Sequence, residues 1–269
     1  MSETRLLDDA KQQAQPALAA LFVSDLHLQP EMPFTAQAFL DFLHTHANKA
    51  AQLYLLGDIF EAWAGDDDLD DPFHAEVVRA IREVADQGTT VFWIAGNRDF
   101  LVGERFAQTT GLQLLPDPFV TTIADQHVVL THGDAYCTDD TAYMQFRNQV
   151  RTPQWQVGFL ALSLAERKKI IAELRAGSRA AQKDKTYDIM DVNDKAIATL
   201  FEQTSAGIMI QGHTHRPARH VQLIDGSERL RYVLSDWDLD GDKPRGDWLS
   251  IDHQGVVQRH GLNGFAVLD

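Results

Sequence analysis

The sequence predicts a layered α/β fold with two sheets and a helical insertion, which we interpret as a lid. Apolar, β-branched runs alternate with helical patterns along most of the chain. Several of these runs end in small or polar clusters, as buried strands do. Helical patterning replaces this alternation over residues 134–186. We therefore expect one main domain over residues 17–269 that carries the lid at about 134–186, after an N-terminal extension over residues 1–16.

The expected elements follow from local patterns. Short apolar runs predict buried strands at residues 18–24, 52–57, 89–96, 127–131 and 207–212. Apolar positions at helical spacing predict helices at residues 34–48, 72–87 and 188–204. After His215 the pattern changes to short two-sided strands, at residues 220–223, 230–235, 248–251 and 256–259. These later strands predict a second sheet, with turns at residues 225–226 and 241–242.

The composition excludes several classes of protein. With 44% hydrophobic and 23% charged residues among 269, the chain is globular rather than disordered or collagen-like. Cys137 is the single cysteine, so no internal disulfide forms, and we expect a reducing compartment, the cytoplasm. No apolar run approaches the roughly 18 residues that span a bilayer. The acidic N-terminal stretch does not resemble a signal peptide.

The charge is unevenly distributed. The net charge is −15, yet residues 147–185 hold nine basic residues against three acidic ones. Such a basic segment is typical either of a local anionic partner or of a solvated helix face. Dense apolar residues lie beside it, from Trp155 to Leu164. An amphipathic basic helix can lie in a membrane interface, whereas the alternative is that these helices pack on each other and on the core.

Residues that ligate metals follow five of the predicted strands. A chance origin is hard to reconcile with five such clusters in order, each after an apolar strand, because strand ends gather in space in α/β folds. Histidine, carboxylate and neutral amide ligands suit Mn, Fe, Co or Zn. Two such ions about 3.5 to 4 Å apart can activate water and stabilise a phosphoryl transition state, and we expect Asp58 to bridge them. The candidate ligands are Asp25, His27, Asp58, Asn97, His132, His213 and His215.

These ordered motifs resemble the calcineurin-like metallophosphoesterases, over about residues 21–217. The resemblance implies a two-sheet sandwich flanked by helices. It also implies that Asp25, His27, Asp58 and His215 hold one metal, while Asp58, Asn97, His132 and His213 hold the other. Most of that superfamily has a histidine after the asparagine, but this chain has Arg98. An arginine can neutralise a diphosphate, and a leaving phosphate with a second pKa of about 6 needs no protonation, so Arg98 predicts hydrolysis of a pyrophosphate bond. The alternative is that Arg98 pairs with Asp99.

Longer strings, such as Gly57 to Trp63 and Gly96 to Leu101, resemble the hydrolases that act on UDP-2,3-diacylglucosamine. The resemblance implies attack of water on the α-phosphorus, two metals that are most commonly Mn²⁺, and a helical cap that receives acyl chains. It implies a peripheral location on the cytoplasmic face of the inner membrane, in lipid A biosynthesis. Catalytic roles fall on Asp58, Asn97, Arg98, His132 and His213. Substrate contacts fall on Asn97, Arg98, Asp140, Ser178, Gln182, Lys185 and His213, with Gln182 standing where that family often has asparagine.

Two other functions stay open at this point. The same site permits a nucleotide phosphodiesterase, although the inserted helices and Arg98 then have no obvious purpose. A scaffold without metal predicts decayed ligands, but all seven are present. We expect no nucleic-acid partner, because aromatic residues do not interleave with the basic segment and the net charge opposes it. No obligate protein partner is evident.

Overall fold

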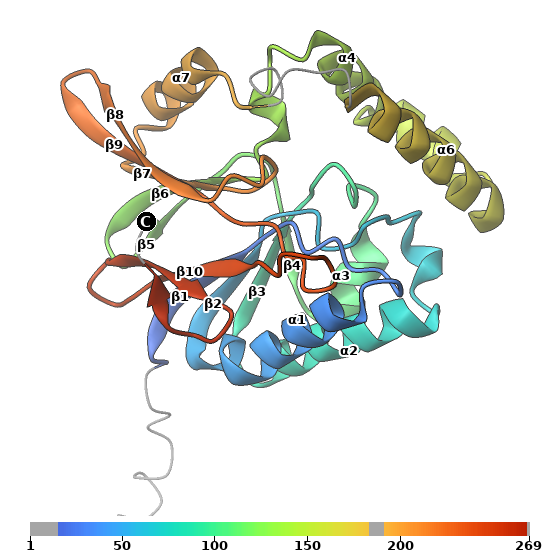
Figure 1. Cartoon of the computed structure of the whole chain (residues 1–269), viewed down its shortest axis with the longest axis horizontal. Coiled ribbons are helices and arrows are strands. Elements are labelled where there is room, and N and C mark those ends of the chain that lie inside the picture. The colour runs from blue at the N-terminus through green and yellow to red at the C-terminus, as the bar shows by residue number, and fades with distance from the viewer. Residues whose placement is uncertain (1–15, 183–190, 268–269) are drawn as a thin grey trace, which may run out of the picture.

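The computed structural model describes residues 16–182 and 191–267, without the side chains of residues 179–182, and arranges them mainly in four layers (Figure 1). Two sheets face each other, α1 and α2 lie beneath one, and α7 lies above the other. The expected sandwich flanked by helices is therefore confirmed. The extension expected over residues 1–16 lies almost wholly outside the described residues. None of the described helices is long and apolar enough to cross a membrane.

The first sheet has seven strands in the order β12-β11-β10-β1-β2-β3-β4. Strands β1 to β4 are parallel, and β10 joins the free edge of β1 in antiparallel register. β1 is buried on both faces, as its unbroken apolar run predicts. The bounds are β1 Leu18–Val23, β2 Ala50–Leu55, β3 Thr90–Ile94, β4 Gln113–Leu115, β10 Asp247–Ile251, β11 Val257–Gly261 and β12 Ala266–Val267.

The second sheet has five strands in the order β5-β6-β7-β9-β8. Its central strands β6, β7 and β9 are parallel, and β5 and β8 form antiparallel edges. Asp225 and Gly226 both have positive φ, as a tight hairpin turn between β8 and β9 requires, so this expected turn is confirmed. The bounds are β5 Phe119–Ile123, β6 Gln126–Thr131, β7 Ile208–Gln211, β8 Ala218–Ile224 and β9 Ser227–Val233.

Helices cover the outer faces of both sheets, and three more helices form an arm beside them (Figure 1). On the first sheet, Val77, Ile81 and Val84 of α2 are buried, and Asp71 caps the start of that helix by accepting a hydrogen bond from Phe73 N at 3.0 Å. The α-helices are α1 Pro33–Thr45, α2 Pro72–Asp86, α3 Glu104–Thr110, α4 Thr141–Val150, α5 Pro153–Leu160, α6 Leu164–Gln182 and α7 Asp194–Thr204. Short 3-10 helices occupy Ala47–Lys49, Asp66–Asp68 and Asp134–Tyr136.

The core between the sheets is built around stacked aromatic rings. Phe22, Tyr54 and Phe92 are register partners on β1, β2 and β3, and their ring centroids lie 5.1 and 4.7 Å apart. Leu130 and Ile210 of the second sheet belong to the same buried cluster. This rigid core holds the carboxyl ends of both sheets in place, and the polar clusters follow those ends.

Two sequence-based expectations are wrong in detail. The strands after His215 do not form a sheet of their own: β8 and β9 join β7, whereas β10, β11 and β12 extend the first sheet. β10 covers the edge that β1 would otherwise expose. The helix expected at 188–204 begins at Asp194, because the Asn193 side chain accepts hydrogen bonds from Lys195 N and Ala196 N and caps it there. Helix α3 and strands β4, β5 and β12 were not predicted.

Candidate active site

Most of the predicted metal ligands lie in strained backbone at the ends of the strands. Five of them have positive φ, a conformation that costs about 1 kcal/mol or more for a residue other than glycine. Such strain concentrates at functional sites, where the surrounding structure enforces it. The five are Asp25 at 54°, His27 at 49°, Asp58 at 54°, His213 at 69° and His215 at 54°.

Three of these residues form one cluster. His27 Nε2 lies 3.2 Å from His215 Nε2, and His215 Nε2 lies 3.2 Å from Asp25 Oδ1. Asp25 is fully buried, and its Oδ1 has no hydrogen-bond partner among the described residues. A buried carboxylate oxygen between two imidazole nitrogens fits a divalent cation, which would satisfy all three.

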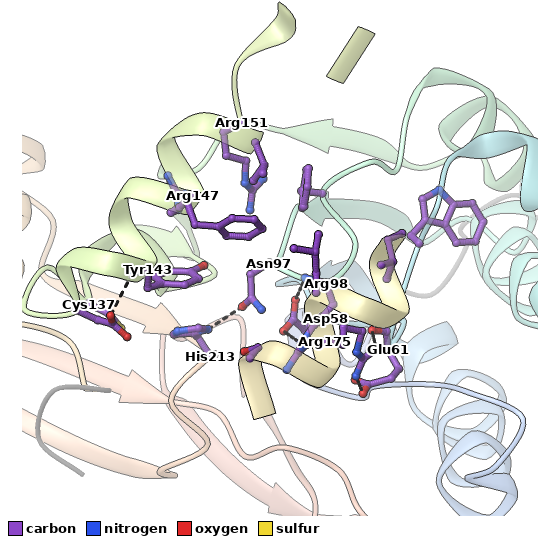
Figure 2. A pocket seen from close by; sticks show the side chains of 18 of the residues that line it. Asp58, Glu61, Asn97, Arg98, Cys137, Tyr143, Arg147, Arg151, Arg175 and His213 are labelled. Carbon is purple, nitrogen blue, oxygen red and sulfur yellow. Dashed lines mark hydrogen bonds and ion pairs between the residues drawn. The ribbon is translucent and has the colours of Figure 1, made fainter. Parts of the chain in front are cut away.

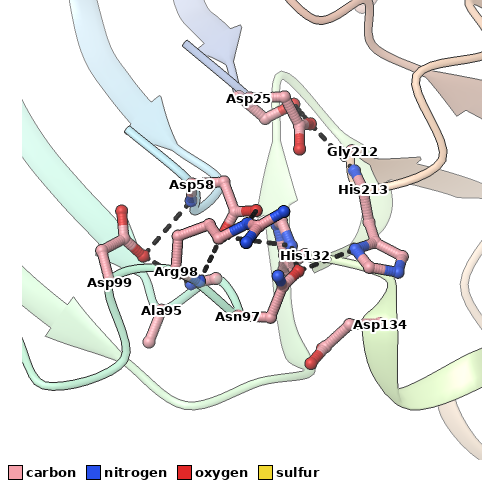
Figure 3. A network of polar contacts seen from close by, with 12 residues as sticks. Asp25, Asp58, Ala95, Asn97, Arg98, Asp99, His132, Asp134, Gly212 and His213 are labelled. Atoms are coloured by element: carbon pink, nitrogen blue, oxygen red, sulfur yellow. Dashed lines mark hydrogen bonds and ion pairs between the residues drawn. The ribbon is translucent and has the colours of Figure 1, made fainter. Parts of the chain in front are cut away.

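The remaining ligands form a second cluster beside the first (Figure 3). Asn97 Oδ1 lies 3.0 Å from His132 Nε2 and 2.9 Å from His213 Nδ1. Asp58 Oδ1 lies 3.7 Å from His132 Nε2. Ligand atoms of Asp25, Asp58 and His132 all lie within 4.8 Å of one another, so the two clusters adjoin. The structure thus brings all seven predicted ligands together.

Three histidines are oriented by acceptors that the sequence analysis did not identify. His27 Nδ1 lies 2.9 Å from Glu61 Oε2, and His132 Nδ1 lies 2.9 Å from the carbonyl oxygen of Leu56. His215 Nδ1 lies 3.5 Å from Asp236 Oδ2. Each acceptor fixes the proton on Nδ1 and turns Nε2 toward the cluster, as a metal ligand requires. Glu61 stands inside a motif quoted above, but only the fold reveals its contact.

The Asp99 carboxylate accepts hydrogen bonds from backbone amides and does not pair with Arg98. This carboxylate accepts hydrogen bonds from Ile59 N at 2.7 Å, Gly96 N at 2.9 Å and Asp58 N at 3.2 Å (Figure 3). Burial, together with the nearby charge of Asp58, raises the pKa of Asp99 to about 6. Asp99 therefore holds the turn that presents Asp58, which leaves the Arg98 guanidinium available to the cavity.

The charges around the site decide how it binds a cation. Burial opposes a charge on His132, but nearby carboxylates, led by Asp58, raise its pKa to about 9. Likewise burial opposes a charge on His215, but Asp236 and Asp25 raise its pKa to about 10. Burial and the charge of His132 lower the pKa of His213 to about 4. At pH 7 the imidazoles of His132 and His215 in the metal-free protein are therefore in their charged form, with a proton on both ring nitrogens.

We expect metal binding to release about two protons at pH 7, because a cation needs the lone pairs that those protons occupy. Since both pKa values are raised in the metal-free protein, cation affinity should rise with pH and fall as pH falls. Calorimetry of Mn²⁺ binding in two buffers of different ionisation enthalpy measures the number released. Equal heats in both buffers at pH 7 would contradict this assignment.

Most basic residues of the arm that the structure describes contact the body of the protein. Arg147 Nε donates to Asp134 Oδ2 at 2.8 Å, and Lys168 Nζ lies 2.7 Å from Asp68 Oδ1. Arg151 donates to the Gly96 carbonyl oxygen at 2.9 Å. Arg167 pairs with Asp67, and Arg175 pairs with Glu61. The solvated-face interpretation is therefore wrong for the four arginines, whose side chains are mostly buried, whereas Lys168 remains half exposed.

A cavity of about 750 Å³ joins the metal clusters to the arm (Figure 2). Its polar end holds His27, Asp58, Asn97, Arg98 and His213, together with the arm residues Arg147, Arg151 and Arg175. Of the predicted substrate contacts, Asn97, Arg98, Asp140, Ser178 and His213 line this cavity. Lys185 and the side chain of Gln182 lie outside the described residues.

The far wall of the cavity is apolar. The rings of Trp155 and Phe159 stack with centroids 4.7 Å apart, and Ile171 and Leu174 of α6 complete this wall. Phe159 also packs against the main core. By contrast, Val157 is 72% exposed, and Leu160 and Leu162 are partly exposed. Some apolar residues of the arm, such as Phe159, therefore pack in the interior, whereas Val157, Leu160 and Leu162 remain exposed to solvent.

The residues 18–217 match the family model for calcineurin-like phosphoesterases. The chain belongs to this family, and the resemblance read from the motifs is confirmed.

Within it, the chain is 48% identical over 236 residues to the UDP-2,3-diacylglucosamine hydrolase of Bordetella parapertussis, covering 87% of this chain and 91% of that protein. It is 47% identical over 230 residues to the protein of the same name from Aromatoleum aromaticum, covering 86% and 94%.

Proposed function

We propose that the chain hydrolyses UDP-2,3-diacylglucosamine. Water attacks the α-phosphorus, the bond from that phosphorus to the bridging oxygen breaks, and the products are UMP and 2,3-diacylglucosamine 1-phosphate, lipid X. The observation that carries this proposal is the cavity that connects the two metal clusters to the apolar wall of the arm. The names of the relatives support the same substrate.

We assign the ligands to two divalent metal ions. Asp25, His27, Asp58 and His215 would hold one ion, and Asp58, Asn97, His132 and His213 the other. Imidazole, carboxylate and amide donors without a thiolate favour Mn²⁺ over Ca²⁺ or Mg²⁺. When bound, the ions lower the pKa of a water molecule and stabilise negative charge on phosphoryl oxygens.

We assign Arg98 to binding the phosphate that is attached to the glucosamine. Its Nε lies 4.0 Å from Asp58 Oδ2 and makes no hydrogen bond within the described part of the chain. A guanidinium in this position donates to diphosphate oxygens and neutralises the charge that develops as the lipid phosphate leaves. That phosphate has a second pKa of about 6 and departs as an anion, so the site needs no general acid for it.

The arm is assigned to the acyl chains and to the membrane. The wall formed by Trp155, Phe159 and Leu174 provides an apolar surface for the chains at the end of the cavity away from the clusters. The exposed side chains of Val157, Leu160 and Leu162 would contact the inner-membrane surface, where a diacyl substrate resides. We retain residues 134–186 as the lid of a domain over residues 17–269.

The decisive assay is release of UMP from UDP-2,3-diacylglucosamine by metal-stripped protein, with and without added Mn²⁺. A water-soluble nucleotide diester serves as the parallel substrate. We expect Mn²⁺-dependent UMP from the lipid substrate and little turnover of the diester. Turnover of the diester alone would keep the metal site and refute this substrate, and no turnover of either would favour a scaffold.

A further inference from the structure

A second, smaller pocket of about 360 Å³ lies against His215, on the outer face of the second sheet. Its wall comes from the hairpin β8–β9, drawn in orange in Figure 1, and from the loop that follows His213. Thr214, His215 and Arg216 line both this pocket and the large cavity. The loop from Thr214 to Arg216 therefore borders both spaces, with the metal ligand His215 in it.

The small pocket contains a buried cation with one hydrogen-bond donor that the fold does not satisfy. Arg231 is only 5% exposed, and its Nε makes no hydrogen bond with any residue in the described ranges, although the charges of Asp191 and Asp194 act on its guanidinium. A buried donor without an acceptor is unfavourable, so a ligand that accepts its hydrogen bond is favoured. The Thr214 hydroxyl is likewise buried and has no partner in the part of the chain that the structure describes.

The lining differs in kind from that of the large cavity. Asp191, which pairs with Arg216, contributes a carboxylate, and His220 lies opposite Arg231 across the hairpin. Ala218 and Val233 add small apolar side chains to the lining. Guanidinium and hydroxyl donors match carbonyl oxygens, a carboxylate matches sugar hydroxyls, and apolar surface matches the face of a flat ring. No acyl-sized apolar wall is found among the described residues here.

We propose that this pocket binds the nucleoside half of the substrate, with Arg231 and Thr214 as its recognition residues. The inference rests on the proposed function, because that reaction leaves the α-phosphate of the nucleotide at the metal clusters. The nucleoside then lies against the hairpin β8–β9, in a pocket that none of the described residues of the arm lines. The two halves of the diphosphate thus occupy two separate pockets on either side of one metal ligand.

The test is the affinity of Mn²⁺-loaded protein for UMP, measured by calorimetry, with inorganic phosphate as a second probe. We expect Arg231→Gln to weaken UMP about tenfold or more, as the loss of a charge-assisted hydrogen bond predicts. Phosphate affinity should stay the same. Arg229→Gln is the matched control, since Arg229 lies two residues along the same strand and does not line the pocket, and it should change UMP affinity by less than about twofold.

Ala218→Leu provides an independent steric variant in case Arg231→Gln does not fold, and it should weaken UMP by filling the pocket. The proposal is overturned if Ala218→Leu leaves the affinity for UMP unchanged. It is also overturned if Arg231→Gln leaves that affinity unchanged in folded protein. If a variant loses as much affinity for phosphate as for UMP, the proposal is also overturned, because the pocket would then bind only an anion. These affinities do not depend on turnover of the lipid, so a failed UMP-release assay and a failed pocket are distinguishable.

Discussion

Replacement of Asp58 by asparagine should lower kcat/KM on UDP-2,3-diacylglucosamine by about a thousandfold or more. Asp58 adjoins both clusters, and each bound cation supplies several kcal/mol of transition-state stabilisation, where about 1.4 kcal/mol is a factor of ten. Asparagine tolerates the positive φ of 54° at this position and can still accept the hydrogen bond from Arg98 N. The substitution therefore removes the charge while it preserves the turn.

The measurement pairs steady-state kinetics with metal content after dialysis. We expect fewer than two metal ions per chain in the variant, and a circular dichroism spectrum like that of the parent, which shows that the variant is folded. Asp86→Asn is the matched control, because Asp86 is an exposed carboxylate on α2 that pairs with Arg82 and belongs to neither cluster, and it should retain full activity. Activity near the parent level with both ions retained would refute the bridging role of Asp58.

The candidate ligands were predictable because their signal is local. Each follows an apolar strand, and parallel strands of one sheet end on the same side, so order along the chain is enough to gather them. Asp25 follows β1, Asp58 follows β2 and His132 follows β6. The two-sheet sandwich followed from the resemblance to the family, whereas the local pattern assigned the later strands to the wrong sheet. Pairing of β10 with β1 depends on contacts 227 or more residues apart, which no local pattern contains.

The partners of these ligands were not predictable, because their signal is tertiary. Nothing near Glu61 in the sequence shows that it orients His27, and Asp236 reaches His215 from a loop beyond β9. The basic segment illustrates the same limit. A list of charges cannot show that Arg167 and Lys168 fold back onto acidic residues one hundred positions earlier. The apparent anion-binding surface is largely a set of internal ion pairs that hold the arm over the cavity.

Arg175 shows how the arm and the metal site are connected. Its guanidinium, on α6, pairs with the Glu61 carboxylate, which in turn orients His27. The helix that forms the apolar wall is thereby joined to a metal ligand through one carboxylate. The position of α6 and the orientation of His27 thus depend on the same carboxylate, which couples the proposed acyl wall to the proposed metal site.

Arg98→Ala should reduce kcat/KM on the diphosphate substrate by about a hundredfold to a thousandfold, the usual loss when one donor to a developing charge is removed. Its backbone amide, which donates to Asp58 Oδ1 at 2.7 Å, survives the substitution, so the metal clusters should retain both ions. An activated aryl phosphodiester lacks the second phosphate, and its turnover should fall much less. Arg98→Lys should restore part of the rate on the diphosphate, because a single charge returns without the paired donors.

The comparison between the two substrates separates a role in charge neutralisation from a structural role. If Arg98 merely held the loop before Asp99, both substrates would lose the same factor and the lysine variant would restore neither. The carboxylate of Asp99 is already filled by three or more backbone amides, which makes such a role unnecessary. A selective loss on the diphosphate would therefore identify Arg98 as the residue that adapts a metallophosphoesterase site, in which histidine commonly follows the asparagine, to a pyrophosphate bond.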